Sequence, residues 1–205
     1  MILKKLVVGK FAVNCYVLMC EDTKEVMVID PGDQSQLISR TIEELQGKLK
    51  YILLTHGHGD HIGGVEALKK ELGGKIIAAE PEQEMLLTPT YNESSRICEY
   101  PIAFEADYYV RHKEIMKLGK HEFKCLYTPG HTKGGMTVSI EGVLFTGDTL
   151  FRQSVGRTDL HGGNMQTLIN SITSLLLPFP SETVVYPGHG AATTIGYEKK
   201  NNPFI

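Results

Sequence analysis

Residues 55–61 read THGHGDH and place three histidines and one aspartate within seven positions, spaced by two glycines. The chain has 205 residues and only eight histidines, so this segment concentrates side chains that can bind a metal. It overlaps the end of the apolar run KYILLT (50–55), which predicts a buried strand. Because a strand end holds side chains in a fixed geometry, this position suits metal ligands.

The order of residues within the segment predicts two neighbouring binding points. His56 and His58 are separated by a single glycine, and the two glycines are expected to let the backbone turn tightly so that alternate side chains converge. Asp60 and His61 follow immediately and can serve a second, adjacent point. Neutral imidazole and carboxylate suit zinc, iron or manganese.

Three further candidates lie at the ends of other predicted strands, each flanked by glycine. LYTPGHT (126–132) carries His131, LFTGDTL (144–150) carries Asp148, and VVYPGHG (184–190) carries His189. Together with the first segment they account for five of the eight histidines. The other three, His112, His121 and His161, are expected to be solvated surface side chains.

Composition and charge are those of an ordinary globular protein. Hydrophobic residues make up 41% and charged residues 22%, and the net charge of −3 gives no basis for a nucleic-acid partner. No segment approaches the length of a membrane span, and Gly9 and Lys10 interrupt the apolar start below signal-peptide length. The four cysteines lack CxxC spacing and are expected to be free thiols in a reducing cytoplasm.

The pattern along the chain alternates short strands with helices and predicts one α/β domain over residues 1–205. Helix 34–47 is expected to present Leu37, Ile38, Ile42 and Leu45 on one face. The periodicity of apolar residues fades between Pro81 and about Tyr109, where a short helix (80–87) is expected to be followed by a long polar and aromatic loop. The predicted strands are 12–20, 25–30, 50–55, 75–79, 121–128, 136–140, 143–148 and 183–190, and the remaining predicted helices are 63–74, 80–87 and 165–176.

The segment HGHGDH (56–61), followed by a distant histidine, aspartate and histidine, resembles the HxHxDH signature of the metallo-β-lactamase superfamily. The resemblance extends over VIDPG around Asp30, TPGHTKGG, FTGDTLF, GRTD and YPGHG, and it is strongest to the glyoxalase II-like (hydroxyacylglutathione hydrolase-like) branch. It implies a four-layer αββα sandwich with the metals at one edge between the two sheets.

The resemblance also implies a role for each candidate residue. His56, His58 and His131 would bind the first metal; Asp60, His61 and His189 the second; Asp148 would bridge both. Asp60 would additionally accept a proton from the nucleophilic water. Asp30 is interpreted as orienting the ligand loop, with a helix cap or turn residue as the alternative. The cofactors expected are two divalent metal ions, with zinc favoured and iron or manganese as alternatives.

Two metal ions about 3.5–4 Å apart can generate a bridging hydroxide that attacks a carbonyl carbon. No serine nucleophile is indicated, since RQSVG (152–156) is not GxSxG. The function predicted is therefore a dinuclear hydrolase of small-molecule thioesters or related esters. A mononuclear iron persulfide dioxygenase and a metal-binding module without turnover are the alternatives, and the complete set of seven ligands favours the hydrolase.

The substrate is less well defined by the sequence than the metal site. Glyoxalase II enzymes draw part of their glutathione site from a C-terminal helical region, and this chain stops sixteen residues after His189, so that region is expected to be lacking. Lys133, Arg152 and Arg157 are candidates either for contacting an anionic substrate or for structural roles. Arg157 and Asp159 are expected to pair and fix a loop.

Overall fold

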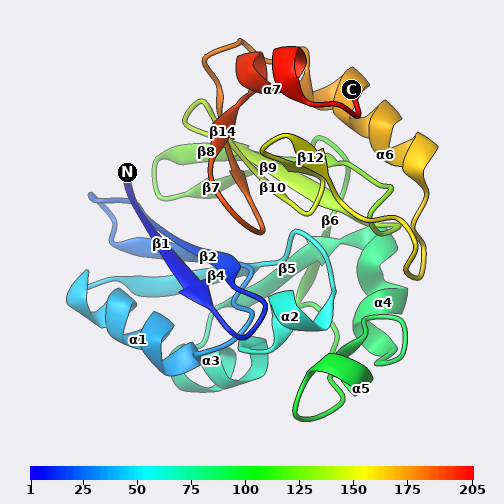
Figure 1. Cartoon of the computed structure of the whole chain (residues 1–205). Coiled ribbons are helices and arrows are strands. Elements are labelled where there is room, and N and C mark those ends of the chain that lie inside the picture. Colours follow the sequence, from blue (N-terminus) through cyan, green and yellow to red (C-terminus); the bar gives the residue numbers. More distant parts are fainter.

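The computed structural model describes all residues 1–205, and two β-sheets lie face to face in it with helices on both outer sides (Figure 1). The first sheet has the order β1 (Ile2–Val8), β2 (Val13–Met19), β3 (Glu25–Ile29), β4 (Lys48–Leu53), β5 (Lys75–Ala79), β6 (Tyr108–Val110). The second has the order β14 (Thr193–Thr194), β13 (Val184–Pro187), β10 (Val143–Gly147), β9 (Met136–Ile140), β8 (His121–Tyr127), β7 (Ile115–Leu118). A separate hairpin joins β11 (Leu150–Phe151) to β12 (Ser154–Val155).

The helices divide between the outer faces of the two sheets, with α1 and α3 outside the first sheet and α6 and α7 outside the second (Figure 1). None of them combines the length and the apolar composition that crossing a lipid bilayer requires. The helical elements are α1 (Ser35–Glu44), α2 (Gly59–Ile62), α3 (Val65–Leu72), η1 (Glu80–Glu82), α4 (Gln83–Leu87), α5 (Ser94–Ile97), α6 (Met165–Ser171), the π-helical η2 (Ile172–Leu176) and α7 (Ile195–Asn201).

Three separate hydrophobic clusters show that the layers number four. One packs the first sheet against α1 and α3, for example through Ile38 and Leu68. The second lies between the sheets and contains Phe123 and Phe145. The third packs the second sheet against α6, η2 and α7 and contains Leu168. Three interfaces require four layers, so the αββα sandwich expected from the sequence is confirmed.

Strand β2 illustrates why an uninterrupted apolar run forms a strand in this fold. All seven of its residues are buried. Cys15 and Val17 point to the helix-facing cluster, whereas Tyr16 and Leu18 point to the cluster between the sheets. Because successive side chains alternate between faces, a strand covered on both sides needs apolar residues at nearly every position.

The strand directions bring the carboxyl ends of five strands to one edge of the sandwich. In the first sheet, β3 and β4 are parallel neighbours. In the second, β8 and β10 are both antiparallel to β9, and β13 is parallel to β10, so all three run the same way. The loops that leave these five strands carry Asp30, residues 55–61, His131, Asp148 and His189. The fold therefore gathers all candidate ligands at one edge.

Hydrogen bonds join the two sheets directly at this edge. The Asn14 side chain donates to the carbonyl oxygens of Pro187 and Gly190, both at 2.9 Å, and the Tyr16 hydroxyl donates to Pro187 at 2.7 Å. The backbone of Met136 donates to Thr55 at 2.8 Å. These bonds fix the loop of His189 and the loop of His56 relative to the opposite sheet.

Several local predictions from the sequence need correction. Strand β1 was not predicted, because the apolar start of the chain has partly exposed residues and lacks clear alternation. Leu37 is 42% exposed, so the face of α1 that packs on the sheet carries Ile38 and Ile42, with Leu45 partly buried beside them, and does not include Leu37. The segment from 88 to 107 is not entirely loop, since α5 lies within it.

We expect Asn14→Ala to lower the free energy of unfolding by about 1–3 kcal/mol. The substitution removes two hydrogen bonds that the buried Asn14 side chain makes to the opposite sheet, at the carbonyls of Pro187 and Gly190, whereas Pro187 keeps its bond from Tyr16. Urea unfolding of the metal-free protein measures the change. Asn201→Ala is the control, because Asn201 is exposed and bonds only within its own helix. Equal effects of the two substitutions would contradict a joining role for Asn14.

Candidate metal centre

The segment 55–61 changes conformation at its middle. His58 is extended, with φ −64° and ψ 146°, and is the N-cap of α2, which begins at Gly59. His56 and His58 therefore lie on the extended stretch that leaves β4, whereas Asp60 and His61 lie on the first turn of the helix. The change from strand to helix directs the two pairs of side chains to separate points.

The two glycines of this segment have a different role from the one expected. Neither Gly57 nor Gly59 has a positive φ, so the turn does not require glycine's conformational freedom. A Cβ at Gly57 would lie 3.0 Å from a methyl carbon of Leu86, and one at Gly59 would lie 2.9 Å from the Cys98 sulfur. Glycine is required here because neighbouring side chains pack directly against the backbone.

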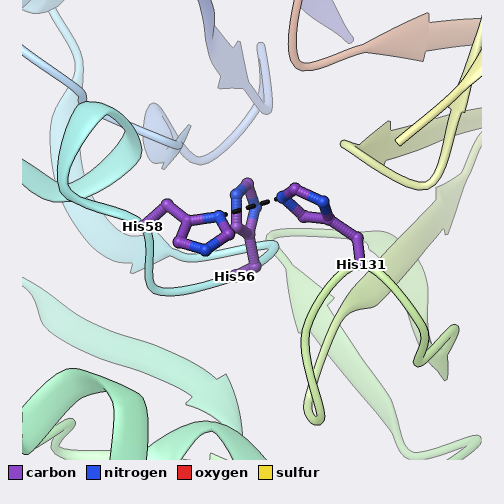
Figure 2. Close-up of side chains that lie close together, drawn as sticks. All are labelled: His56, His58 and His131. Atoms are coloured by element: carbon purple, nitrogen blue, oxygen red, sulfur yellow. Dashed lines mark hydrogen bonds between the residues drawn. The ribbon is translucent and has the colours of Figure 1, made fainter. Parts of the chain in front are cut away.

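The first group of candidate ligands consists of His56, His58 and His131. One ring nitrogen from each of them lies within 4.8 Å of the corresponding nitrogens of the other two, and the three residues are no more than 4% exposed. Figure 2 shows the three rings together, with His58 Nδ1 at 2.9 Å from His131 Nε2. These residues come from loops in different sheets.

The second group consists of Asp60, His61 and His189, whose candidate ligand atoms also lie within 4.8 Å of one another. His61 Nε2 is 3.2 Å from His189 Nε2, and His189 Nε2 is 3.4 Å from Asp60 Oδ2. Asp60 and His189 have side chains that are 16% and 28% exposed, so this group lies at the solvent side of the centre.

Asp148 faces both groups. Its Oδ2 is 3.7 Å from His131 Nε2 in the first group and 3.6 Å from His189 Nε2 in the second, and its Oδ1 is 3.5 Å from His61 Nε2. The structure therefore brings together all seven ligand candidates predicted from the sequence. The position of Asp148 between the groups is the arrangement that a bridging carboxylate needs.

Four of the five histidines are held through Nδ1 by a partner outside the centre, which directs Nε2 inward. His58 has the opposite orientation and faces His131 with Nδ1. The Nδ1 partners are Thr55 Oγ1 for His56 at 3.1 Å, Asp30 Oδ2 for His61 at 3.0 Å, the Arg157 carbonyl for His131 at 2.8 Å and the Phe11 carbonyl for His189 at 3.0 Å.

Asp30 lies beside the centre and is 1% exposed. Its carboxylate accepts hydrogen bonds from the Thr55 backbone at 2.8 Å and the Thr55 hydroxyl at 2.6 Å, in addition to its contact with His61. Although Asp30 also lies within reach of His56 and His61, these partners occupy its oxygens, so it is better suited to orient ligands than to bind a metal. Its φ of 51° places it in the left-handed region, which is uncommon for aspartate and typical of constrained functional sites.

The two groups differ in the protonation they favour. Burial lowers the pKa of His58 to about 3 and lowers that of His56 well below its ordinary value, so these imidazoles are neutral and their lone pairs are free. His61 differs: although burial opposes its charge, Asp148, Asp60 and Asp30 raise its pKa to about 10. Burial also opposes the charged form of Asp60, but His61 and His189 outweigh it and hold the pKa of Asp60 below its usual range.

The unpaired polar atoms of the centre fit a bound cation. His56 Nε2 and Asp148 Oδ1 are buried and have no hydrogen-bond partner. Buried polar atoms are rarely left unpaired, and a divalent metal would accept their lone pairs. Around His61, three carboxylates favour a positive charge, which a metal ion can supply in place of the proton. Imidazole and carboxylate ligands suit zinc, iron or manganese.

The remaining histidines do not join the centre. His112 is exposed, as expected. His121 was expected to be solvated but is only 7% exposed, because its ring packs at the start of β8 with Nδ1 at 2.9 Å from Glu141. His161 is half-buried because its ring stacks on Tyr91 at 3.6 Å between centroids.

The basic residues considered for substrate binding all have partners. Lys133 donates to Glu84 at 2.6 Å, and the Arg152 guanidinium lies over the Tyr197 ring. Arg157 donates two hydrogen bonds of 2.7 Å to Asp159, which is the pairing predicted from GRTD.

Sequence reasoning missed Glu82, whose side chain is 1% exposed and lies next to the first group. It accepts hydrogen bonds from the backbones of Gly57 and Gly134 and from the Thr132 hydroxyl. Burial raises its pKa above the usual range, although these bonds favour the carboxylate. The acidic run EPEQE (80–84) is typical of a solvated helix start, so no signal in it marks Glu82 as buried.

Comparison with known proteins identifies relatives over nearly the whole chain. The family model described as the metallo-beta-lactamase superfamily matches residues 8–189. A curated relative from Haemophilus influenzae, named hydroxyacylglutathione hydrolase GloC, is 40% identical over 202 residues, which cover 97% of this chain and 95% of the relative.

Solved structures agree with this result. The crystal structure of the BLEG-1 B3 metallo-beta-lactamase superposes with a TM-score of 0.92 at 38% identity and covers 99% of both chains. ETHE1 from Myxococcus xanthus gives 0.85 at 30% identity, covering 99% of this chain and 84% of that one. TTHA1623 in a di-iron-bound form gives 0.88 at 29% identity, covering 98% of this chain and all of that one.

The two groups are expected to be separable by mutation. His58→Ala should remove one metal equivalent and His189→Ala the other, because they belong to different groups, whereas Asp148→Ala should weaken both. Metal-to-protein ratios measured by mass spectrometry after dialysis test this. An equal loss in all three variants would contradict the assignment of separate groups.

For the metal-free protein, the free energy of unfolding should be greatest near pH 6.5. Between about pH 3 and 6.5 the unfolded chain binds more protons at His58 than the folded protein, so stability falls as the solution is acidified. Between 6.5 and about 10 the folded protein retains a proton on His61 that the unfolded chain has lost, so stability falls as pH rises. Urea unfolding in chelator from pH 5 to 9 measures both slopes, and stability that rises above pH 7 would contradict the second.

Proposed function

The chain belongs to the metallo-beta-lactamase superfamily, and from this premise we propose that it is a dinuclear metal-dependent hydrolase of thioesters or related esters. The observation that carries the proposal is the position of Asp148 between two histidine-containing groups. A binding module would not require a carboxylate shared between a buried group and a second group at the solvent side. The name of the 40% identical relative supports a thioester such as a hydroxyacylglutathione as the substrate class.

We assign the first metal to His56, His58 and His131, the second to Asp60, His61 and His189, and a bridging position to Asp148. When bound, two divalent ions would supply Lewis acidity, lowering the pKa of water and polarising the substrate carbonyl. Zinc is our first choice of metal, and iron is the alternative supported by the di-iron form of TTHA1623.

Asp60 is suited to accept a hydrogen bond from water in this centre, whereas its lowered pKa makes it a weak base. Its low pKa keeps it ionised at neutral pH, and its side chain is 16% exposed, so water can reach it. His189, 3.4 Å away, holds the carboxylate in place. We propose that Asp60 orients the attacking water as well as binding metal.

A pocket of about 530 Å³ opens beside Asp60, a volume within the range of small-molecule sites. Phe11 and Tyr100 line it with aromatic surface, and Lys10 and Glu99 supply charges of both signs. We propose that the acyl part or the thiol part of the substrate lies in this pocket. Cys98 also lines it, but burial raises the pKa of its thiol, so it is a poor nucleophile and a covalent mechanism is not favoured.

We place the protein in the cytoplasm. All four cysteines are free, and Cys15, Cys20 and Cys125 are buried, as is usual for a protein from a reducing compartment. The substrate would then be a small metabolite of that compartment.

Persulfide oxidation at iron is the second candidate function, and it is favoured by the 30% identical ETHE1 structure.

We expect the zinc-loaded protein to release free thiol from a lactoyl-glutathione thioester without consuming oxygen. Smaller thioesters should compete well if no helical region contributes to glutathione binding. Thiol release and oxygen uptake are measured on one preparation, offered the thioester, a glutathione persulfide and a β-lactam in turn. Asp148→Ala is the control and should lose turnover together with metal.

Two outcomes would overturn the proposal. Oxygen uptake with the persulfide, alongside no thioester cleavage after loading with either zinc or iron, would identify the oxidation as the activity. Opening of the β-lactam ring with no thiol release would instead place the chain with the enzyme type named for BLEG-1.

A further inference from the structure

Glu82 is a buried carboxylate with no basic side chain among its hydrogen-bond partners. It is the last residue of η1, directly after β5, and it is 1% exposed. Burying a carboxylate without a cation carries a large desolvation cost unless hydrogen bonds satisfy its oxygens. The hydrogen-bond partners of Glu82 therefore indicate which part of the structure this buried carboxylate stabilises.

All three partners belong to the two loops that form the first metal group. Glu82 Oε1 accepts a hydrogen bond of 2.8 Å from the backbone of Gly57, which lies between His56 and His58. Glu82 Oε2 accepts bonds of 2.7 Å from the Gly134 backbone and 3.1 Å from the Thr132 hydroxyl, and Thr132 directly follows His131. One carboxylate thus joins the loop after β4 in one sheet to the loop after β8 in the other.

The backbone of both loops is pressed against this carboxylate. A Cβ added at Gly134 would lie 2.6 Å from Glu82 Oε2, and one at Gly57 would lie 3.4 Å from Oε1. Gly134 therefore has to be glycine for its loop to reach Glu82, whereas the contact at Gly57 is of ordinary van der Waals length. Because Gly57 separates the two histidines of its loop by one residue, a shift of its amide would move both rings.

We propose that Glu82 is a positioning residue that sets the separation of His58 and His131 and thereby the metal affinity of the first group. The inference rests on the proposed metal assignment but not on the identity of the substrate. Glu82 would do for the first group what Asp30 does for the second, where a buried carboxylate holds His61. Neither carboxylate needs to touch the metal to act in this way.

The test measures metal affinity at each group separately. In a His189→Ala background the first group remains intact, and in a His58→Ala background the second does. Metal-free proteins are titrated with Co²⁺, whose visible absorption reports ligand geometry. We expect Glu82→Gln to weaken Co²⁺ binding about 10–100-fold in the His189→Ala background and to change its spectrum, because an amide cannot accept all three bonds. Affinity in the His58→Ala background should be unchanged.

Glu198→Gln provides a matched control for stability alone. Glu198 is also fully buried and accepts bonds from a backbone amide, a threonine hydroxyl and a third donor, namely Gln153 at 2.8 Å, Thr193 at 2.5 Å and Asn202 at 2.9 Å. None of these three partners lies in the candidate ligand loops after β4 and β8. We expect Glu198→Gln to lower the melting temperature of the metal-free protein and to leave both Co²⁺ affinities unchanged.

The inference would be overturned by one result: Glu82→Gln lowers the melting temperature as Glu198→Gln does, but leaves the Co²⁺ affinity unchanged in both backgrounds. If Glu82→Gln does not fold, Thr132→Val decides, because it removes a single hydroxyl bond to Glu82 and keeps the size of the side chain. Weaker Co²⁺ binding at the first group alone supports the positioning role, and unchanged binding opposes it.

The outcome is distinguishable from failure of the proposed function. A protein that binds Co²⁺ at both groups but cleaves no thioester would refute the hydrolase and leave the role of Glu82 intact. A hydrolase whose first-group affinity is insensitive to Glu82→Gln would refute the role of Glu82 alone.

Discussion

The hydrogen bonds that join the two sheets at their shared edge are the constraint on which the rest of the centre depends. Asn14 and Tyr16 of β2 bind the carbonyl of Pro187 in β13, and Met136 of β9 binds the carbonyl of Thr55. The candidate ligands come from loops of both sheets, so any sliding of one sheet over the other would separate them. Side-chain packing between the sheets is not directional, whereas these hydrogen bonds fix one relative position.

Within that frame, buried carboxylates set the details of the centre. Asp30 holds Thr55 and His61, and Glu82 contacts the loops of His58 and His131. The histidines near the acidic side are drawn toward the charged form, whereas His58, surrounded by other imidazoles, is kept neutral by burial. The metal-free centre thus contains ready lone pairs on one side and an excess of negative charge on the other. Both features favour a cation.

Close packing explains why glycine stands beside ligands at positions whose backbone conformation does not require it. Gly188 lies where a Cβ would come 2.7 Å from the His61 ring, and Gly59 lies against Cys98. These glycines allow ligand loops to approach one another in a small volume. Of the three glycines that directly precede a ligand in TPGHT, FTGD and YPGHG, Gly130 and Gly147 have a positive φ and Gly188 does not. A centre assembled in this way is rigid, which suits ligands that must hold a metal at fixed distances.

The sequence by itself indicated the family, and through that resemblance the four-layer fold and the set of seven ligand candidates, because the motifs that carry the resemblance are short, continuous segments of the chain. It also indicated the pairing of Arg157 with Asp159, which are two residues apart. The tertiary structure alone decided the burial of Glu82 and His121 and the addition of β1 to the first sheet. These depend on contacts between residues far apart in the chain, for example Glu82 with Gly134, and a single sequence carries no local signal for them.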